Sequence, residues 1–407
     1  MNDPTPGFRS VLRNRQYLLW LASSNAAMVG YSVYSISVVW LAYTVTGSYA
    51  IVGVVLFVEY AAYSGAFLIA PLADRVGNQR TIYLVCYPIQ AAAAATIGAA
   101  AAYGVLTIPL LVSLIVLISV LWDLPWAASN AAPRLVLTPE EMFAAGGVSG
   151  AIGGANSIAG YAMGGVLILV VGAYGGMFLY TALLLVGAAF AVGLRIHPQP
   201  TPGVGFGESF REGWRTLRSG VGRPLLQIAS VDAAQGFFMA GTALFITLLS
   251  IREFSGSSSA YGVLFTVYII GGVAAGLGLG WLNPRRRAGF VMVSSLFVAA
   301  VAFAAVGLVP VNLAFVALLW LVLGVSLSAY ADAKYAYLRG SVEPNRLARV
   351  TSNMYLFPGI SSAAGALVLG VLAGSLSPLG FGLVLGAGLL ASGVLAALLP
   401  TVKVLRY

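Results

Sequence analysis

The sequence predicts an all-α membrane protein with twelve transmembrane helices arranged as two pseudo-symmetric six-helix bundles. Three observations predict this fold: scarce charge, long apolar runs, and a repeat between the two halves. Of the 407 residues, 60% are hydrophobic and only 8% are charged, whereas soluble domains carry about 25% charged residues. A chain with so little charge cannot cover a water-facing surface, so it must use lipid as its solvent.

The apolar runs are long and do not alternate with polar residues, as membrane β-strands would, so helices are predicted. A helix needs roughly 20 apolar residues to span the hydrocarbon core. Such runs occupy residues 16–45, 49–73, 81–103, 107–133, 145–172, 175–195, 223–251, 258–282, 288–308, 312–337, 350–374 and 378–400.

Positive charge gathers in every second gap between the runs. Cationic residues stay on the cytoplasmic side of a membrane, so both termini are expected to be cytoplasmic, in an inner or plasma membrane. The remaining gaps contain only Arg252, balanced by Glu253. Because the charge lies between membrane runs, the net charge of +9 does not indicate nucleic-acid binding, and membrane lipids are the expected partners.

The only long polar segment, residues 196–222, is expected to be a cytoplasmic linker. It begins with several prolines and contains the lone histidine, His197, which we interpret as a solvated loop residue. Phe210, Trp214 and Leu217 follow with the spacing of an amphipathic helix, which can lie on the inner membrane face. The predicted domains are therefore residues 1–195, the linker, and residues 223–407.

The two halves carry matching residues at nearly constant offsets. Asn25, Met28, Ser32 and Ser35 correspond to Asp232, Gln235, Met239 and Thr242 at an offset of 207 residues. Each set lies on one helix face. Gly47 matches Gly256 at an offset of 209, and Arg134 matches Arg339 at an offset of 205. This pattern indicates a six-plus-six duplication, as parallel-repeat transporters have.

The segment Ala70-Pro-Leu-Ala-Asp-Arg-Val-Gly-Asn-Gln-Arg80 resembles the G-x-L-A-D-R-x-G-x-x-R signature of the major facilitator superfamily. Ala70 replaces the first glycine, and the second-half counterpart, Gly280 to Arg285, is degraded. The resemblance covers the whole chain. The linker, together with the loops at Thr138 and Glu343, resembles the branch of enterobactin exporters and some multidrug exporters.

The resemblance implies an inner gate. Asp74 would contact the start of a helix in the other half, where a carboxylate favours the positive end of the helix dipole, and Gly77 would allow the tight turn. The arginines of the predicted gate are equally consistent with ordinary positive-inside charge or interfacial snorkelling; they are Arg75, Arg80, Arg134, Arg339, Arg346 and Arg349.

Gly160, Gly164 and Gly165 resemble a glycine run found in antiporters of the superfamily, although Tyr161 stands where that run has proline. Close helix packing through small residues explains them equally well.

Four acidic residues lie within apolar runs: Asp232, Asp332, Glu59 and Asp123. A charge at mid-bilayer costs roughly 2.5–3.5 kcal/mol on insertion scales, and a carboxyl group in a low-dielectric cavity can bind and release protons near neutral pH. The four are therefore candidates for proton coupling, with Asp232 foremost. The alternative for each is a structural hydrogen bond. Lys334, near the end of its run, is expected at the cytoplasmic rim.

The repeated polar faces are expected to line a substrate cavity with nearby aromatic residues, although many of those aromatics could simply pack. The predicted lining comprises Asn25, Met28, Ser32, Ser35, Gln235, Met239, Thr242, Tyr31, Tyr34 and Tyr268. Met and aromatic side chains with a few carboxylates suit amphipathic or cationic organic molecules.

These observations predict a secondary active transporter, working as a monomer, that exports such solutes in antiport with protons, as multidrug efflux proteins do. The alternative is a proton-coupled importer or facilitator of a specific metabolite on the same fold. An enzyme or receptor is disfavoured because the sequence shows no zinc-protease, serine-hydrolase or Walker A motif. With Cys86 as the only cysteine, no metal site or cofactor is expected.

Overall fold

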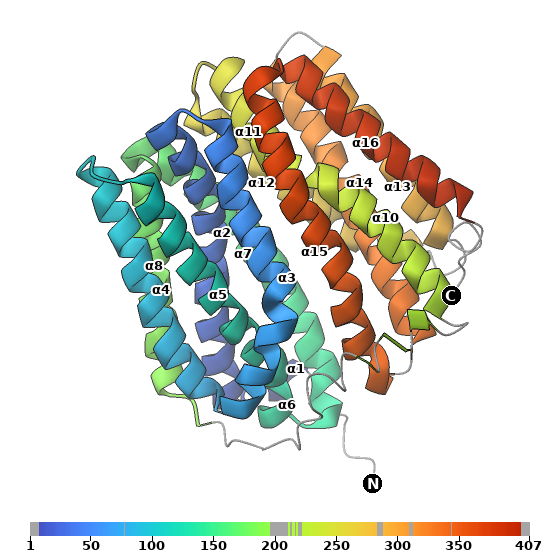
Figure 1. Cartoon of the computed structure of the whole chain (residues 1–407). Coiled ribbons are helices and arrows are strands. Elements are labelled where there is room, and N and C mark those ends of the chain that lie inside the picture. The colour runs from blue at the N-terminus through green and yellow to red at the C-terminus, as the bar shows by residue number, and fades with distance from the viewer. Residues whose placement is uncertain are drawn as a thin grey trace. The chain divides into compact units, whose positions relative to one another are not determined.

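The computed structural model describes residues 8–76, 78–195, 211, 214–215, 217–218, 222–282, 288–308, 312–342 and 344–399, and these are helices with short connections (Figure 1). The helices are α1 (Phe8–Val11), α2 (Arg15–Thr46), α3 (Tyr49–Val76), α4 (Gln79–Ala102), α5 (Ile108–Ala131), α6 (Pro133–Val136), α7 (Pro139–Val171), α8 (Ala173–Val192), α10 (Arg223–Met239), α11 (Gly241–Arg252), α12 (Ser258–Leu282), α13 (Ala288–Leu308), α14 (Leu313–Ser341), α15 (Pro344–Ser375) and α16 (Pro378–Leu398).

Within the described residues, ten helical segments are long and apolar enough to cross a membrane, and two shorter apolar helices cover Tyr49–Gly65 and Ala159–Ile168. These twelve segments coincide with the twelve predicted runs. The run predicted over residues 223–251 is interrupted at Ala240, between α10 and α11. The all-α fold is confirmed, and the chain is a multi-pass membrane protein.

Local sequence sets the ends of several helices. Asn78 caps α4 by accepting a hydrogen bond from the Thr81 backbone amide, and Thr138 and Glu141 form a capping box at the start of α7. The chain reverses between α4 and α5 at Gly104 and between α7 and α8 at Gly172, with φ of 68° and 88°. Glycine adopts this left-handed region without steric cost.

The described residues fall into two compact units. Unit 1 comprises residues 1–41 and 65–203, and unit 2 comprises residues 42–64 and 204–407. The end of α2 and the first part of α3 therefore group with unit 2. The predicted domains, residues 1–195, 196–222 and 223–407, follow chain order and stay a prediction.

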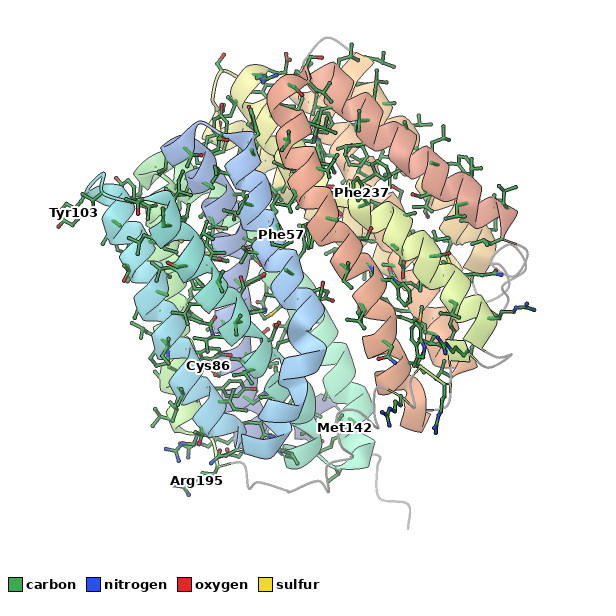
Figure 2. The ribbon with its side chains drawn as sticks, viewed as in Figure 1. Phe57, Cys86, Tyr103, Met142, Arg195 and Phe237 are labelled. Atoms are coloured by element: carbon green, nitrogen blue, oxygen red, sulfur yellow. The ribbon has the colours of Figure 1, made fainter. Side chains whose placement is uncertain are left out.

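Unit 1 is held together by aromatic packing and by close helix approach. Tyr34 of α2 and Tyr180 of α8 are completely buried, with ring centroids 4.9 Å apart. Cys86 on α4 is buried and free in the interior of this unit (Figure 2). The ring contact joins α2 to α8 in the core of this unit, which also buries the acidic Asp123 of α5.

Unit 2 packs its helices in pairs through glycine. A Cβ atom at Gly324 of α14 would collide with the backbone oxygen of Tyr268 on α12, and one at Gly365 of α15 would collide with that of Phe237 on α10. A Cβ at Gly386 of α16 would lie 2.8 Å from the backbone oxygen of Ala300 on α13. Small residues let helix backbones approach closely, which is how membrane helices associate.

Most of the predicted linker lies outside the described residues, including His197 and Phe210. Of its described part, Leu217 is fully buried, and the Trp214 ring stacks on Phe357 of α15 with centroids 6.1 Å apart. Of the described apolar positions of the predicted amphipathic helix, Trp214 therefore packs against α15 and Leu217 is buried.

Candidate functional site

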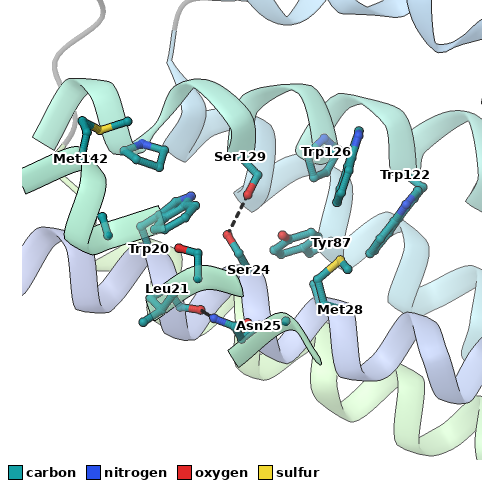
Figure 3. Close-up of a pocket in the computed structure, with 16 residues that line it drawn as sticks. Trp20, Leu21, Ser24, Asn25, Met28, Tyr87, Trp122, Trp126, Ser129 and Met142 are labelled. Carbon is teal, nitrogen blue, oxygen red and sulfur yellow. Dashed lines mark hydrogen bonds between the residues drawn. The ribbon is translucent and has the colours of Figure 1, made fainter. Parts of the chain in front are cut away.

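Unit 1 contains a cavity of about 390 Å³, within the size range of small-molecule sites. It lies among α2, α4, α5 and α7 (Figure 3). Its lining comprises Trp20, Leu21, Ser24, Asn25, Ala27, Met28, Tyr87, Trp122, Pro125, Trp126, Ser129, Pro133, Met142, Ala145, Ser149 and Gly153. None of these described lining residues carries a formal charge.

One wall of the cavity is aromatic. Trp122 and Trp126 lie one turn apart on α5, opposite Met28 of α2 (Figure 3). The Trp122 ring stacks on Tyr31 of α2, with centroids 4.2 Å apart and planes inclined by 15°. This stacking holds one face of the indole, so the ring has a defined orientation beside the cavity.

The polar groups of the cavity come from α2, α4, α5 and α7. Ser129 donates a hydrogen bond to Ser24 at 3.2 Å. The Asn25 side chain donates to the Leu21 carbonyl at 2.5 Å and accepts from Asn156 of α7. These bonds tie α2 to its neighbours and leave a mostly apolar lining with a few polar positions.

The structure separates the predicted cavity residues of the first half. Asn25 and Met28 line the cavity. The hydroxyls of Ser32 and Ser35 instead donate to carbonyls of their own helix, those of Met28 and Ser32. Tyr31 supports the cavity through Trp122, and Tyr34 is buried against Tyr180.

Sequence reasoning missed the aromatic wall. Trp122, Pro125, Trp126 and Ser129 follow one another at helical spacing on α5, and this periodicity was the available signal. Asp123, the candidate predicted from this segment, does not line the cavity.

Unit 2 contains a buried ion pair between Asp232 of α10 and Lys334 of α14, with Nζ and Oδ2 3.0 Å apart. Their side chains are 4% and 12% exposed. Two neutral groups complete the site: the Tyr330 hydroxyl donates to Asp232 Oδ1 at 2.8 Å, and Gln235 donates to the same atom at 3.1 Å. Both carboxylate oxygens of Asp232 are therefore satisfied.

The Lys334 ammonium lies over the rings of Tyr330 and Tyr335, 5.8 and 5.2 Å from their centroids. A space of about 10 Å³, enough for about one water molecule, borders the pair beside Thr351 and Met354 of α15. The prediction that Lys334 sits at a solvated rim is wrong, because its long side chain reaches inward to the carboxylate one helix away.

The other acidic residues have different surroundings. Asp123 is 4% exposed, and its Oδ2 atom makes no hydrogen bond within the described part of the chain. Glu59 is half-buried on α3. Asp332 is exposed on α14 and faces Gly276 of α12, where a Cβ atom would lie 3.7 Å from its Oδ2. The four carboxylates do not form one cluster.

The residues of the second-half stripe are in contact as two pairs, and the second pair spans the interruption at Ala240. Asp232 bonds Gln235, and the Thr242 hydroxyl approaches the Met239 sulfur at 3.9 Å. Tyr268 of α12 packs edge-on against Trp320, with centroids 6.2 Å apart. Gln235, which was predicted to line the cavity, thus bonds to the Asp232 carboxylate of the ion pair.

The predicted inner gate lies largely outside what the structure describes. Gly77 is not among the described residues, and although the helices containing them are described, the side-chain placements of Asp74, Arg75, Arg134, Arg339, Arg346 and Arg349 are not. Arg80 is exposed in the first turn of α4. Its role in a gate stays a prediction, as do those of the other residues.

Two residues of the predicted glycine run bring α7 against α2. A Cβ atom at Gly160 would lie 2.5 Å from the Ser32 Cβ, and one at Gly164 would lie 2.6 Å from the Ile36 Cδ1. Gly165 is buried beside them. This contact explains the small residues by packing, which is the alternative the sequence left open. No group of three potential metal ligands occurs among the described residues.

The comparisons with known proteins agree on the fold. No protein-family model matches the chain, and no curated protein matches it in sequence. A structure of the nucleoside transporter NupG matches with a TM-score of 0.75 and 14% identity, covering 94% of this chain and 97% of that one. A POT family transporter in complex with 5-aminolevulinic acid matches with a TM-score of 0.74 and 12% identity, covering 96% of each chain.

A bacterial homologue of the iron transporter ferroportin, in an inward-facing state, matches with a TM-score of 0.69 and 15% identity, over 95% of this chain and 97% of that one. At such low identity the likeness concerns the fold. This chain therefore has the fold that the resemblance implied, that of the major facilitator superfamily.

Proposed function

We propose that this chain is a secondary active transporter that exports a small amphipathic or cationic organic solute in exchange for protons. The observation that carries the proposal is the uncharged, aromatic-lined cavity of about 390 Å³ in unit 1. It occurs in a fold whose matched structures are named as a nucleoside transporter, a POT family transporter and a bacterial homologue of the iron transporter ferroportin.

The cavity lining supports this class of solute. Indole and phenol rings attract cations through their faces, and Met side chains adapt to irregular apolar shapes. No Arg or Lys occurs among the described lining residues, so a strongly anionic solute would find no counter-charge there. A sugar would find few polar groups for its hydroxyls.

The Asp232–Lys334 pair supports proton coupling. Asp232 lies nine residues after the start of α10, about 13 Å along the helix axis, where a charge is costly without its partner. A proton on the carboxylate would remove the ionic attraction and leave Lys334 unpaired, so protonation and helix arrangement are linked. Asp123, buried with a carboxylate oxygen lacking a described partner, is the second candidate.

Several finer features belong to the same proposal. The exporter-type branch, a monomeric state, an inner- or plasma-membrane location, cytoplasmic termini and the inner gate around Asp74 follow from the sequence patterns. One proton crossing 100 mV carries about 2.3 kcal/mol, enough to drive modest solute gradients. Protons and the solute are the proposed partners, and catalysis is not part of the proposal.

The test measures efflux of a cationic dye, ethidium, in inside-out vesicles with an imposed pH gradient. The wild type is expected to move the dye only with the gradient, and Asp232→Asn is expected to lower this flux at least tenfold. Glu253→Gln, an exposed acid beyond the end of α11, is the matched control and should transport normally.

Dye flux that is indifferent to the gradient and unchanged in Asp232→Asn would contradict proton coupling at this residue. Uptake of one polar metabolite in proteoliposomes, with no dye flux, would instead support the importer on the same fold. No flux of any solute would contradict transport itself.

A further inference from the structure

We infer that three exposed arginines of the linker, Arg211, Arg215 and Arg218, form a binding surface for the headgroups of anionic lipids, held in place by the stacking of Trp214 on α15. This surface contains none of the residues of the cavity or of the ion pair, so lipid binding there goes beyond the proposed transport. We call these three residues the linker arginines.

The apolar side of the described linker is occupied within the protein. The Trp214 ring stacks on Phe357 of α15, with centroids 6.1 Å apart and planes inclined by 13°, and Leu217 is fully buried. Both residues are helical, and residues three apart in a helix lie on the same side. The polar side of the linker is therefore the side that meets the surroundings.

The linker arginines follow one another at helical spacing. They occupy positions i, i+4 and i+7, which share one helix face, and all three are exposed. None of them forms an ion pair with another residue that the structure describes. The guanidinium of Arg218 lies over the Trp214 ring, 5.2 Å from its centroid, a contact that orients the group and provides no acceptor in the ring plane for its N–H donors. The linker arginines can therefore donate to a ligand with charged oxygens.

The charge of the segment favours an anionic ligand. Residues 208–223 contain four arginines and two glutamates, a net charge of +2. Guanidinium groups bind phosphate oxygens through paired N–H donors. Clusters of arginine beside a membrane span are attracted to anionic lipids.

The position of the linker along α15 indicates a lipid as the source of the phosphate. The described membrane-crossing part of α15 begins at Asn353, and Phe357 lies only four residues further, about 6 Å along the helix axis. Trp214 is thus held near the boundary between hydrocarbon and headgroups, where tryptophan is enriched in membrane proteins. The next membrane-crossing segment begins at Arg223, shortly after Arg218, so the linker arginines stay close to the headgroups.

The test measures which lipids remain bound to the full-length protein. The protein is reconstituted into vesicles of equal parts phosphatidylcholine and anionic phosphatidylglycerol, extracted in mild detergent, and analysed for copurifying lipid by mass spectrometry. The wild type is expected to retain phosphatidylglycerol in an excess of about fivefold or more, the effect of a single arginine at a charged membrane surface. Equal retention of the two lipids would overturn the inference.

Charge-removing variants locate the binding. The combination of Arg211→Gln, Arg215→Gln and Arg218→Gln should remove most of the excess of phosphatidylglycerol, because the phosphate then has no guanidinium partner on the linker.

The matched control loses the same charge from exposed arginines outside the linker, through Arg13→Gln, Arg15→Gln and Arg195→Gln, and should keep the excess. An excess that persists in the linker variant, or that falls equally in both, would mean that the lipid responds to net charge or binds elsewhere, and the inference would be wrong.

A second pair of variants tests the placement of the surface by Trp214. Trp214→Ala removes the stacked ring without changing the charge and should lower the excess of phosphatidylglycerol, whereas Trp214→Phe keeps a ring and should preserve it. An unchanged excess in Trp214→Ala would contradict the placement. Nucleic acid that copurifies in place of phosphatidylglycerol and is lost from the linker variant would contradict a lipid partner. Retention of lipid needs neither a solute nor a gradient, so its outcome is separate from that of the transport test.

Discussion

The Asp232–Lys334 pair shows how one residue depends on another in a lipid-embedded chain. Tyr330 and Lys334 lie one turn apart on α14, so both reach the carboxylate on α10. Removing two charges from water is costly, and their attraction offsets that cost only when the geometry is good and the remaining sites are bonded. Here both carboxylate oxygens are bonded, so the pair is well compensated.

Asp232→Ala should destabilise the protein by about 3–5 kcal/mol, because it leaves a buried ammonium without its partner. Asp232→Ala combined with Lys334→Met should recover most of that loss, since no charge is then buried. Denaturant unfolding of the purified protein in detergent measures both free energies. The single variant Lys334→Met completes the comparison. If the double variant loses as much unfolding free energy as Asp232→Ala and Lys334→Met lose together, the two residues are not coupled.

At the level of helices, glycine sets how closely the pairs of unit 2 pack. The backbone of α14 at Gly324 touches the α12 backbone at Tyr268, and no side chain fits between them. Elsewhere on α12, a Cβ atom at Gly278 would meet nothing within 4 Å. The same residue type is thus required for packing at one position and dispensable at the other.

Gly324→Ala should destabilise the protein by roughly 1–3 kcal/mol, because the added methyl forces two helices apart. Gly278→Ala is the matched control and should be neutral or stabilise by up to about 1 kcal/mol, since alanine favours a helix interior over glycine. Thermal unfolding of the two variants in detergent gives the comparison. An equal change in both would show that α12 and α14 do not meet as closely as described.

For the whole molecule, the distribution of charge predicts the orientation in the membrane. Arg80 lies at the start of α4 in a basic gap, and Tyr103 lies beyond the end of the same helix in an uncharged gap, with its side chain 83% exposed (Figure 2). The positive-inside rule predicts that Arg80 lies in the cytoplasm and Tyr103 outside. The native Cys86 is 3% exposed, so it interferes little with labelling.

A membrane-impermeant maleimide should label Tyr103→Cys in intact cells and Arg80→Cys only after permeabilisation. Both changes are made in a Cys86→Ser background, and the extent of labelling is read by gel shift. The opposite pattern would invert the topology and place both termini outside.

Much of the fold could be predicted from the amino-acid sequence alone. Twelve spans follow from apolar length alone, because a helix must satisfy its own backbone in lipid. In the described structure Asp232 bonds Gln235, three residues along the same helix, and Asn25 and Met28 border the unit 1 cavity, while their role in binding a substrate stays a prediction. These are local properties, set by 3.6 residues per turn.

What the sequence determined by itself is therefore the helices, their membrane environment and the faces they present, since these depend on neighbours within a few residues. Only the tertiary structure decided that Lys334 meets Asp232 rather than the rim, and that Trp20, Trp122 and Trp126 enclose one cavity. Such contacts join residues about a hundred positions apart. Their selection depends on how helices approach one another, which the periodicity of a single helix does not specify.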